Sequence, residues 1–153
     1  MRMLLVPALA LPLLCASGAL AQAASDAKLT WGPTPAAFPA GAKMAVVSGD
    51  PTKAGPFVIQ LALPDGYKIA PHTHPTDEQV SVIKGTFVFA TGKTWDQSAM
   101  KEMPVGASGK VPADMPHYAA AKGATVVQIT STGPFAITYV NKADDPRNKK
   151  TTE

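Results

Sequence analysis

The chain has 153 residues, and its 14 lysines and arginines nearly balance its 11 aspartates and glutamates, for a net charge of +3. This modest charge is scattered and is not interleaved with aromatic side chains, which argues against a nucleic-acid interface. With a single cysteine, Cys15, the chain cannot form an internal disulfide.

The first 21 residues have the pattern of a secretory signal peptide. Arg2 precedes an apolar run over residues 3–14, and residues 19–21 and 21–23 each fit the small-x-small cleavage rule. The run is shorter than the roughly 20 apolar residues that a membrane-spanning helix needs. We therefore expect cleavage after Ala21 or Ala23, a mature chain free of the membrane and of Cys15, and a periplasmic or secreted protein.

Short runs rich in β-branched and aromatic residues follow, separated by many of the chain's 15 prolines and 12 glycines. Several alternate apolar and polar residues, which predicts half-buried strands. The runs cover residues 44–48, 57–63, 79–84, 86–91, 125–131 and 135–140. Strands of this length with turn signals between them predict an all-β sandwich or barrel. Helix signals are weak, and only residues 95–103 could form a turn or two.

These runs divide the chain into four parts. Residues 1–21 are the expected signal peptide, and residues 22–43 form an irregular lead-in. Residues 44–141 form a single β-barrel domain, and residues 142–153 form a charged surface tail. The mature part is long enough to bury a core of its own.

The three histidines of the chain are unevenly placed. His72 and His74 are one residue apart, so their side chains share a face if the segment is extended. Glu78 follows four residues later, and His117 would have to come from a distant strand. Neutral imidazoles and a carboxylate suit manganese, iron, cobalt, nickel, copper or zinc. The pattern predicts a metal site.

The same residues carry a resemblance to the cupin superfamily. The first cupin motif, G-x5-H-x-H-x3-E-x6-G, is matched at every specified position: Gly66, His72, His74, Glu78 and Gly85. The second, G-x5-P-x-G-x2-H-x3-N, is matched at Gly106, Pro112 and His117, with Asp114 and Ala121 as departures. Asp114 replaces a turn glycine, a mild change because aspartate tolerates left-handed backbone conformations.

The resemblance covers about residues 57–140 and implies an antiparallel jelly-roll barrel of the RmlC-like kind, with one divalent metal inside. Its ligands would be His72, His74, Glu78 and His117. Gln79 is a competing ligand, but the six-residue spacing to Gly85 favours Glu78. The alternative is a cupin barrel that binds no metal and satisfies its histidines with hydrogen bonds.

The resemblance extends to small exported single-domain bacterial cupins, whose activities are mostly unassigned. It also favours a homodimer formed through sheet edges, which need covering.

Four protein ligands on an octahedral ion would leave two open positions. A divalent ion, one carboxylate and three neutral imidazoles sum to a charge of +1, which favours anionic oxygen ligands such as enolates or carboxylates. Resemblance to some cupin oxygenases suggests that Glu78 could also act as a general base. Candidates for the pocket wall are Phe87, Phe89, Tyr139 and Gln79, although a small barrel also fills its core with such aromatic residues.

Three functions remain open at this point. The first is a metal-dependent oxygenase acting on a small enol-like or aromatic compound, with iron, copper, nickel or manganese. The second is a non-redox metal-dependent isomerase, lyase or decarboxylase, for which zinc would also serve. The third is a non-catalytic module that binds a small ligand or a metal, and the chain leaves no room for the signalling domain that a sensor would normally carry. We expect an enzyme, and the oxygenase first.

Overall fold

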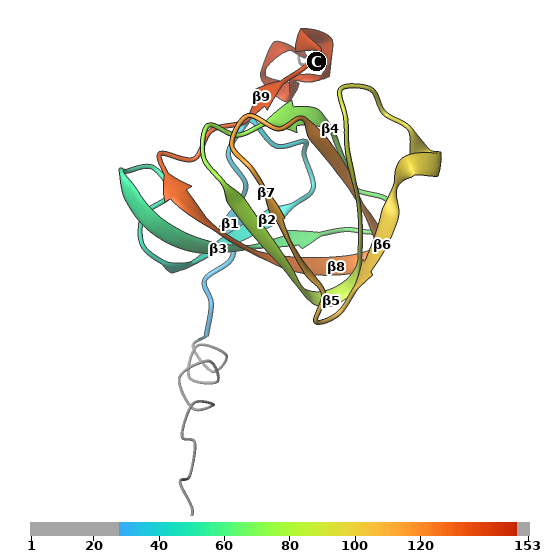
Figure 1. Cartoon of the computed structure of the whole chain (residues 1–153). Coiled ribbons are helices and arrows are strands. Elements are labelled where there is room, and N and C mark those ends of the chain that lie inside the picture. Colours follow the sequence, from blue (N-terminus) through green and yellow to red (C-terminus); the bar gives the residue numbers. More distant parts are fainter. Residues whose placement is uncertain (1–27, 150–153) are drawn as a thin grey trace, which may run out of the picture.

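The computed structural model describes residues 28–149, and the expected signal peptide lies outside them. This part of the chain is built almost entirely of strands (Figure 1). The strands are β1 (Gly32–Pro33), β2 (Lys43–Ser48), β3 (Gly55–Leu63), β4 (Lys68–Thr73), β5 (Glu78–Thr91), β6 (Lys101–Pro104), β7 (Ser108–Val111), β8 (His117–Gly133) and β9 (Thr138–Tyr139). Three single 3-10 turns are η1 (Gln97–Ala99), η2 (Lys142–Asp144) and η3 (Pro146–Asn148). Within these residues, nothing helical has the length and apolar character to cross a membrane.

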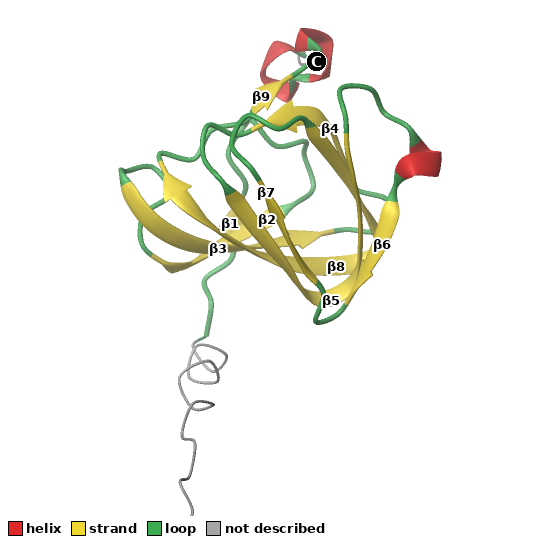
Figure 2. Ribbon diagram, in the orientation of Figure 1, coloured by secondary structure: helices red, strands yellow, loops and turns green. Residues whose placement is uncertain are grey.

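The strands form one curled antiparallel sheet (Figure 2). Its order is β1-β2-β3-β8-β4-β9, and β5 pairs with β8 as well as with β6 and β7. The sheet wraps round a core of buried aliphatic and aromatic side chains drawn from β3, β4, β5 and β8. The predicted all-β jelly-roll barrel is confirmed.

The two longest strands, β5 and β8, pair over most of their length, and β5 joins two runs that the sequence presents separately. The predicted strands 79–84 and 86–91 are one strand, irregular around Gly85. Gly85 has φ +75°, and a Cβ there would lie 2.5 Å from the carbonyl oxygen of Ala124. Only glycine accepts both the left-handed backbone and this close approach.

Four strands were not among the predicted runs: the two-residue β1, and β4, β6 and β7. β4 contains Pro71, and β6 and β7 are four-residue segments of mixed polarity, "KEMP" and "SGKV". They lack alternation of their own, and their register is set by the long neighbours with which they pair. The run 95–103 yields one 3-10 turn, capped by the Asp96 side chain, which accepts from Ser98 N at 2.9 Å.

The lead-in contributes more to the barrel than its irregular composition predicts. Residues 34–42, called the strap here, place the side chain of Phe38 in the core with 6% exposure. Tyr139 Oη donates to the carbonyl oxygen of Ala37 at 2.8 Å, and Tyr67 Oη donates to that of Pro39. Burial raises the pKa of Tyr139 to about 12, so this hydroxyl stays a donor. The strap is therefore fixed to the barrel.

Candidate metal centre

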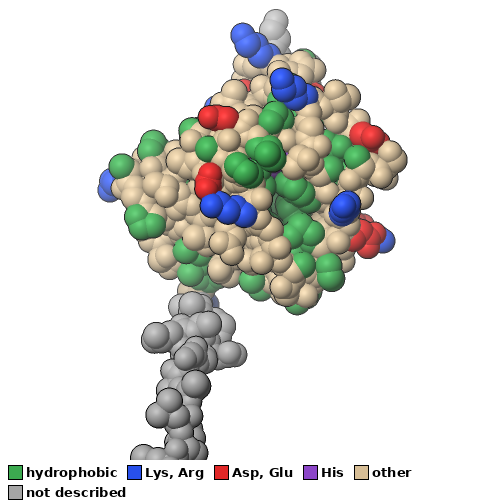
Figure 3. Space-filling model, viewed as in Figure 1, with side chains coloured by type: hydrophobic (Ala, Val, Ile, Leu, Met, Phe, Trp, Pro, Cys, Tyr) green, Lys and Arg blue, Asp and Glu red, His purple; other side chains and the backbone are tan. Residues whose placement is uncertain are grey.

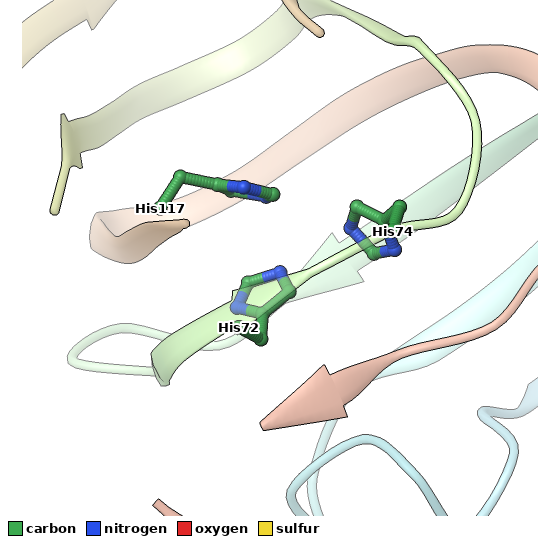
Figure 4. A group of neighbouring side chains, drawn as sticks. All are labelled: His72, His74 and His117. Atoms are coloured by element: carbon green, nitrogen blue, oxygen red, sulfur yellow. The ribbon is translucent and has the colours of Figure 1, made fainter. Parts of the chain in front are cut away.

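Four elements bring the predicted ligands to one place inside the barrel. His72 lies near the end of β4, opposite His117, the first residue of β8. His74 follows β4 in the turn, and Glu78 opens β5. Each of these four residues is at most 4% exposed, and a ring nitrogen of each histidine lies within 4.8 Å of the other two (Figure 4). Three buried histidines this close together could hold a metal ion.

Backbone carbonyls fix the orientation of all three imidazoles. The Nδ1 atoms of His72, His74 and His117 lie 2.7, 2.8 and 2.9 Å from the carbonyl oxygens of Ala70, Ala136 and Met115. A carbonyl oxygen only accepts, so each Nδ1 carries the proton and each neutral ring keeps its lone pair on Nε2. Metal-binding histidines use this arrangement, in which one nitrogen is anchored and the other is free for the ion.

The Glu78 carboxylate faces two of these free nitrogens. Its Oε1 lies 3.6 Å from His74 Nε2, and its Oε2 lies 3.5 Å from His117 Nε2. Both distances are too long for good hydrogen bonds. They are close to the separation of about 3 Å expected for adjacent ligands at metal–ligand distances of about 2.1 Å. The donor set therefore fits a divalent transition metal with only small adjustments.

Burial favours the neutral form of the His72 and His74 imidazoles. Desolvation lowers the pKa of His72 well below its usual value, and the positive charges that His117 and His74 would carry lower it further. Desolvation also lowers the pKa of His74, although the Glu78 carboxylate opposes part of this shift. These rings remain in the form that binds a metal at neutral pH.

Comparisons with known proteins identify the fold. No family model matches the sequence, and no curated protein matches it. Among solved structures, the polyketide cyclase RemF from Streptomyces resistomycificus is similar, with a TM-score of 0.65 and 13% identity over 78% of this chain and 84% of that one. A putative acetylacetone dioxygenase from Methylibium petroleiphilum has a TM-score of 0.60 and 20% identity over 94% and 90%. A cupin 2 conserved barrel domain protein from Rhodopseudomonas palustris has a TM-score of 0.59 and 13% identity over 76% and 81%. The chain has the cupin fold.

The two cupin motifs meet through the backbone. Asp114 has φ +59°, the left-handed conformation expected where aspartate replaces the motif glycine. Its backbone N donates to the carbonyl oxygen of His74 at 2.8 Å. This bond ties the loop that leads to His117 to the segment that carries His72 and His74.

The cupin barrel encloses a small cavity beside the four predicted ligands. It offers about 30 Å³ to the centres of water molecules, room for about two of them. Apart from the ligands its walls are apolar: Phe38, Leu61, Leu63, Ile69, Val80, Phe87, Phe89, Ala119, Val127, Ile129 and Phe135. Because the site is buried among apolar side chains, electrostatic interactions within it are stronger than in bulk water.

The predicted pocket residues divide into two groups. Phe87 and Phe89 line the cavity. Tyr139 is buried with its ring centroid 5.9 Å from that of His72, but its side chain packs behind the histidine and does not line the cavity. The structure does not support Gln79 as a wall residue or a competing ligand. Because side chains alternate along β5, Glu78 points inward and Gln79 is exposed on the outer face.

Sequence reasoning missed Phe38, which reaches the cavity from the strap. The only signal was an aromatic residue inside a run of alanines and prolines, "PAAFPAG". Phe38 stacks on Phe135 with ring centroids 6.4 Å apart, and Phe135 stacks on His74 at 4.7 Å. Phe135 thus packs on the face of the His74 ring, and Phe38 supports Phe135.

Proposed function

We propose that this cupin binds one divalent transition metal ion through His72, His74, His117 and Glu78 and is a metal-dependent enzyme of the oxygenase type. Iron, manganese, nickel, copper and zinc all suit the donors. Its substrate would be a small enol-like or aromatic compound. One observation carries the proposal: three buried imidazoles have their Nδ1 atoms bound to carbonyl oxygens, which leaves their Nε2 atoms free beside a carboxylate.

The bound ion would supply Lewis acidity towards oxygen donors of the substrate. The remaining work falls to the chain. The three Nδ1 bonds hold the imidazoles in place, and the apolar walls exclude water. Glu78 has its two carboxylate oxygens near different histidines, so one oxygen can accept a proton from the substrate while the other keeps its place.

An oxygenase is favoured by the likeness to the putative acetylacetone dioxygenase, which spans 94% of this chain. Acetylacetone is a small diketone that ionises to an enolate, the ligand class expected from the charge of the site. The alternative is a non-redox isomerase, lyase or decarboxylase working through an enolate. It is favoured by the likeness to the polyketide cyclase and by a carboxylate base in an apolar cavity.

Metal content tests the proposal. Protein purified without added metal or chelator should carry about one equivalent of a divalent transition metal. Iron, copper, nickel or manganese together with oxygen uptake on 1,3-diketones or phenols supports the oxygenase. Zinc without oxygen uptake supports the non-redox alternative. No metal, and none taken up on addition, overturns both.

Two neighbouring residues provide a matched pair of variants. Glu78→Gln should lower metal affinity and abolish turnover, because it removes the charged ligand and the base. Gln79→Ala should change neither, because Gln79 is exposed on the opposite face of β5. Equal effects of the two substitutions would contradict the assigned role of Glu78.

We also propose export to the periplasm or the medium, supported by the pattern of residues 1–21. N-terminal sequencing of protein recovered from those fractions should then begin at Gln22 or Ala24. An intact Met1 would contradict it.

A further inference from the structure

An open groove lies beside the metal cavity, on the face of the barrel that carries β6 and β7. Its volume of about 490 Å³ is within the range of about 300–1,000 Å³ typical of small-molecule sites. Most of its lining residues are small or apolar, including Thr91, Ala99, Met103, Ala107 and Gly109, and the others are Lys101, Glu102 and Ser108. Figure 3 shows hydrophobic side chains gathered along the middle of this face.

Phe89 separates the groove from the cavity. Its half-buried side chain lines both spaces, and its ring centroid lies 5.6 Å from that of His117. Val80 lines two spaces. One is the cavity, and the other is a small hollow that adjoins the groove at Met103 and Gly109. The groove and the predicted ligands are thus divided by one aromatic ring and one aliphatic side chain.

The cavity is too small to hold a whole substrate, so most of the substrate must lie in a neighbouring space. With room for about two water molecules, it can take the donor atoms of a substrate but not an organic body. The groove has that room, and a turn of the Phe89 ring about its side-chain bonds would join the two spaces.

The charges round the groove favour an anion. Glu102 is paired with Lys122 at 2.6 Å, and Lys110 is paired with Asp77 at 2.7 Å. Within residues 28–149 Lys101 forms no ion pair, so it contributes an uncompensated positive charge to the groove lining.

We propose that this groove is the substrate-binding site and that Phe89 is the gate between it and the metal. The ligand would be a small organic anion whose apolar body lies against Met103, Ala107 and Gly109, while its oxygen-donor end passes Phe89 to the cavity. This inference rests on the proposed function and defines the substrate class of that site.

Groove binding can be tested without any metal. Benzoate combines an apolar ring with an oxygen anion, and methionine-methyl NMR gives a local signal because the Met103 methyl lies 3.6 Å from the Cβ position of Gly109. Titration of the metal-free protein with benzoate should shift the Met103 methyl resonance and leave that of Met44, on β2, in place. Gly109→Phe should fill the groove and abolish the shift. Gly32→Phe is the matched control, because Gly32 lies outside the groove and a Cβ there meets nothing within 4 Å.

The gate is tested by the kinetics of cobalt exchange. Phe89→Ala should speed both Co²⁺ uptake and Co²⁺ release to a chelator by about tenfold and leave the equilibrium affinity nearly unchanged. Phe89→Leu should have a smaller effect of the same kind, and Gly109→Phe should slow both rates. Val88→Ala is the control, because Val88 is next to Phe89 on β5 but lines neither the cavity nor the groove, and it should leave both rates within about twofold.

The outcomes separate the two proposals. A protein that takes up no cobalt refutes the metal site, while the benzoate titration still tests the groove. An unshifted Met103 methyl, or a shift that persists in Gly109→Phe, overturns the groove as the binding site. Faster exchange in Phe38→Ala than in Phe89→Ala overturns the gate and places the entrance at the strap.

Discussion

Two cross-strand pairs on β8 show how one strand serves two purposes. Near its start, His117 lies opposite His72 of β4, and further along, Ile129 lies opposite Ile59 of β3. Both pairs are buried, yet the first buries polar rings and the second only hydrocarbon. The polar pair is tolerated because each ring donates Nδ1 to the carbonyl two residues before it. The start of β8 thus contributes to the polar site, and the later part of the same strand packs in the apolar core.

The largest expected effect comes from breaking the polar pair. His117→Ala or His72→Ala should reduce metal affinity by more than about 100-fold, since loss of a ligand exceeds the effect of losing its supporting hydrogen bond. The fold should persist, because the Ile59 half of the barrel is untouched. Metal analysis and circular dichroism measure the two effects separately. Full metal occupancy in both variants would disprove the ligand assignment.

Breaking the apolar pair should have the converse result. Ile59 is fully buried and does not line the cavity, so Ile59→Ala should lower the free energy of unfolding by about 2–5 kcal/mol. Metal content per folded molecule should not change. Denaturant unfolding and metal analysis on the same sample provide the check, and a variant that keeps its stability but loses its metal would mean that the two halves are not separable.

A smaller effect is expected where β5 bends between the two halves. Gly85→Ala introduces a Cβ at φ +75°, 2.5 Å from the carbonyl oxygen of Ala124. The strain should cost about 1–3 kcal/mol. Gly66→Ala has a similar φ of +72° but meets nothing within 4 Å, so it isolates the conformational part of that cost. Equal destabilisation by the two variants would show that the close approach at Gly85 contributes nothing.

The smallest effect lies outside both pairs, in the turn that leads into β3. Asp50 accepts from Thr52 Oγ1 and Thr52 N at 2.6 and 2.9 Å, and these bonds lower its pKa from 3.8 to about 2. Because the folded-state value is the lower one, this stabilisation is present above pH 3.8 and is lost as the pH falls through about 2. The stability difference between the native protein and Asp50→Asn should shrink over that interval in acid unfolding curves. If this stability difference stays constant over that pH range, the Thr52 hydrogen bonds to Asp50 do not stabilise the fold.

Much of the apolar half could be predicted from the sequence, and less of the polar half. The runs 57–63 and 125–131 alternate so clearly that β3 and the second half of β8 are where they were expected. The start of β8, "HYAAAKGA", has no such alternation, and β4 contains a proline. These segments form strands because their neighbours pair with them, which no local pattern reveals.

The clustering of the candidate ligands was predicted from their spacing, but the residues that support them were not. Side chains His72, His74 and Glu78 stand out because histidine and glutamate are rare in this chain. No sequence pattern points to the Ala136 carbonyl that orients His74, because every residue has a carbonyl. Nor does any pattern place Phe38 at the cavity wall, because an isolated phenylalanine is common in any sequence. The sequence did not show which residues of β5 point into the barrel, so Gln79 was wrongly predicted to line the pocket. In the structure Glu78 points inward and Gln79 points outward.

The strap has a consequence for the order in which the chain folds. Its two hydroxyl anchors are Tyr67 and Tyr139, which lie 28 and 102 residues further along the chain than the carbonyls that they bind. Contacts across such separations form late, because the intervening chain must be ordered first. The strap leaves the ribosome before β2, and it is therefore fully secured only after β9, the last strand, has docked. Until then we expect the Phe38 side chain to be unpacked and the part of the core that it covers to be exposed to water.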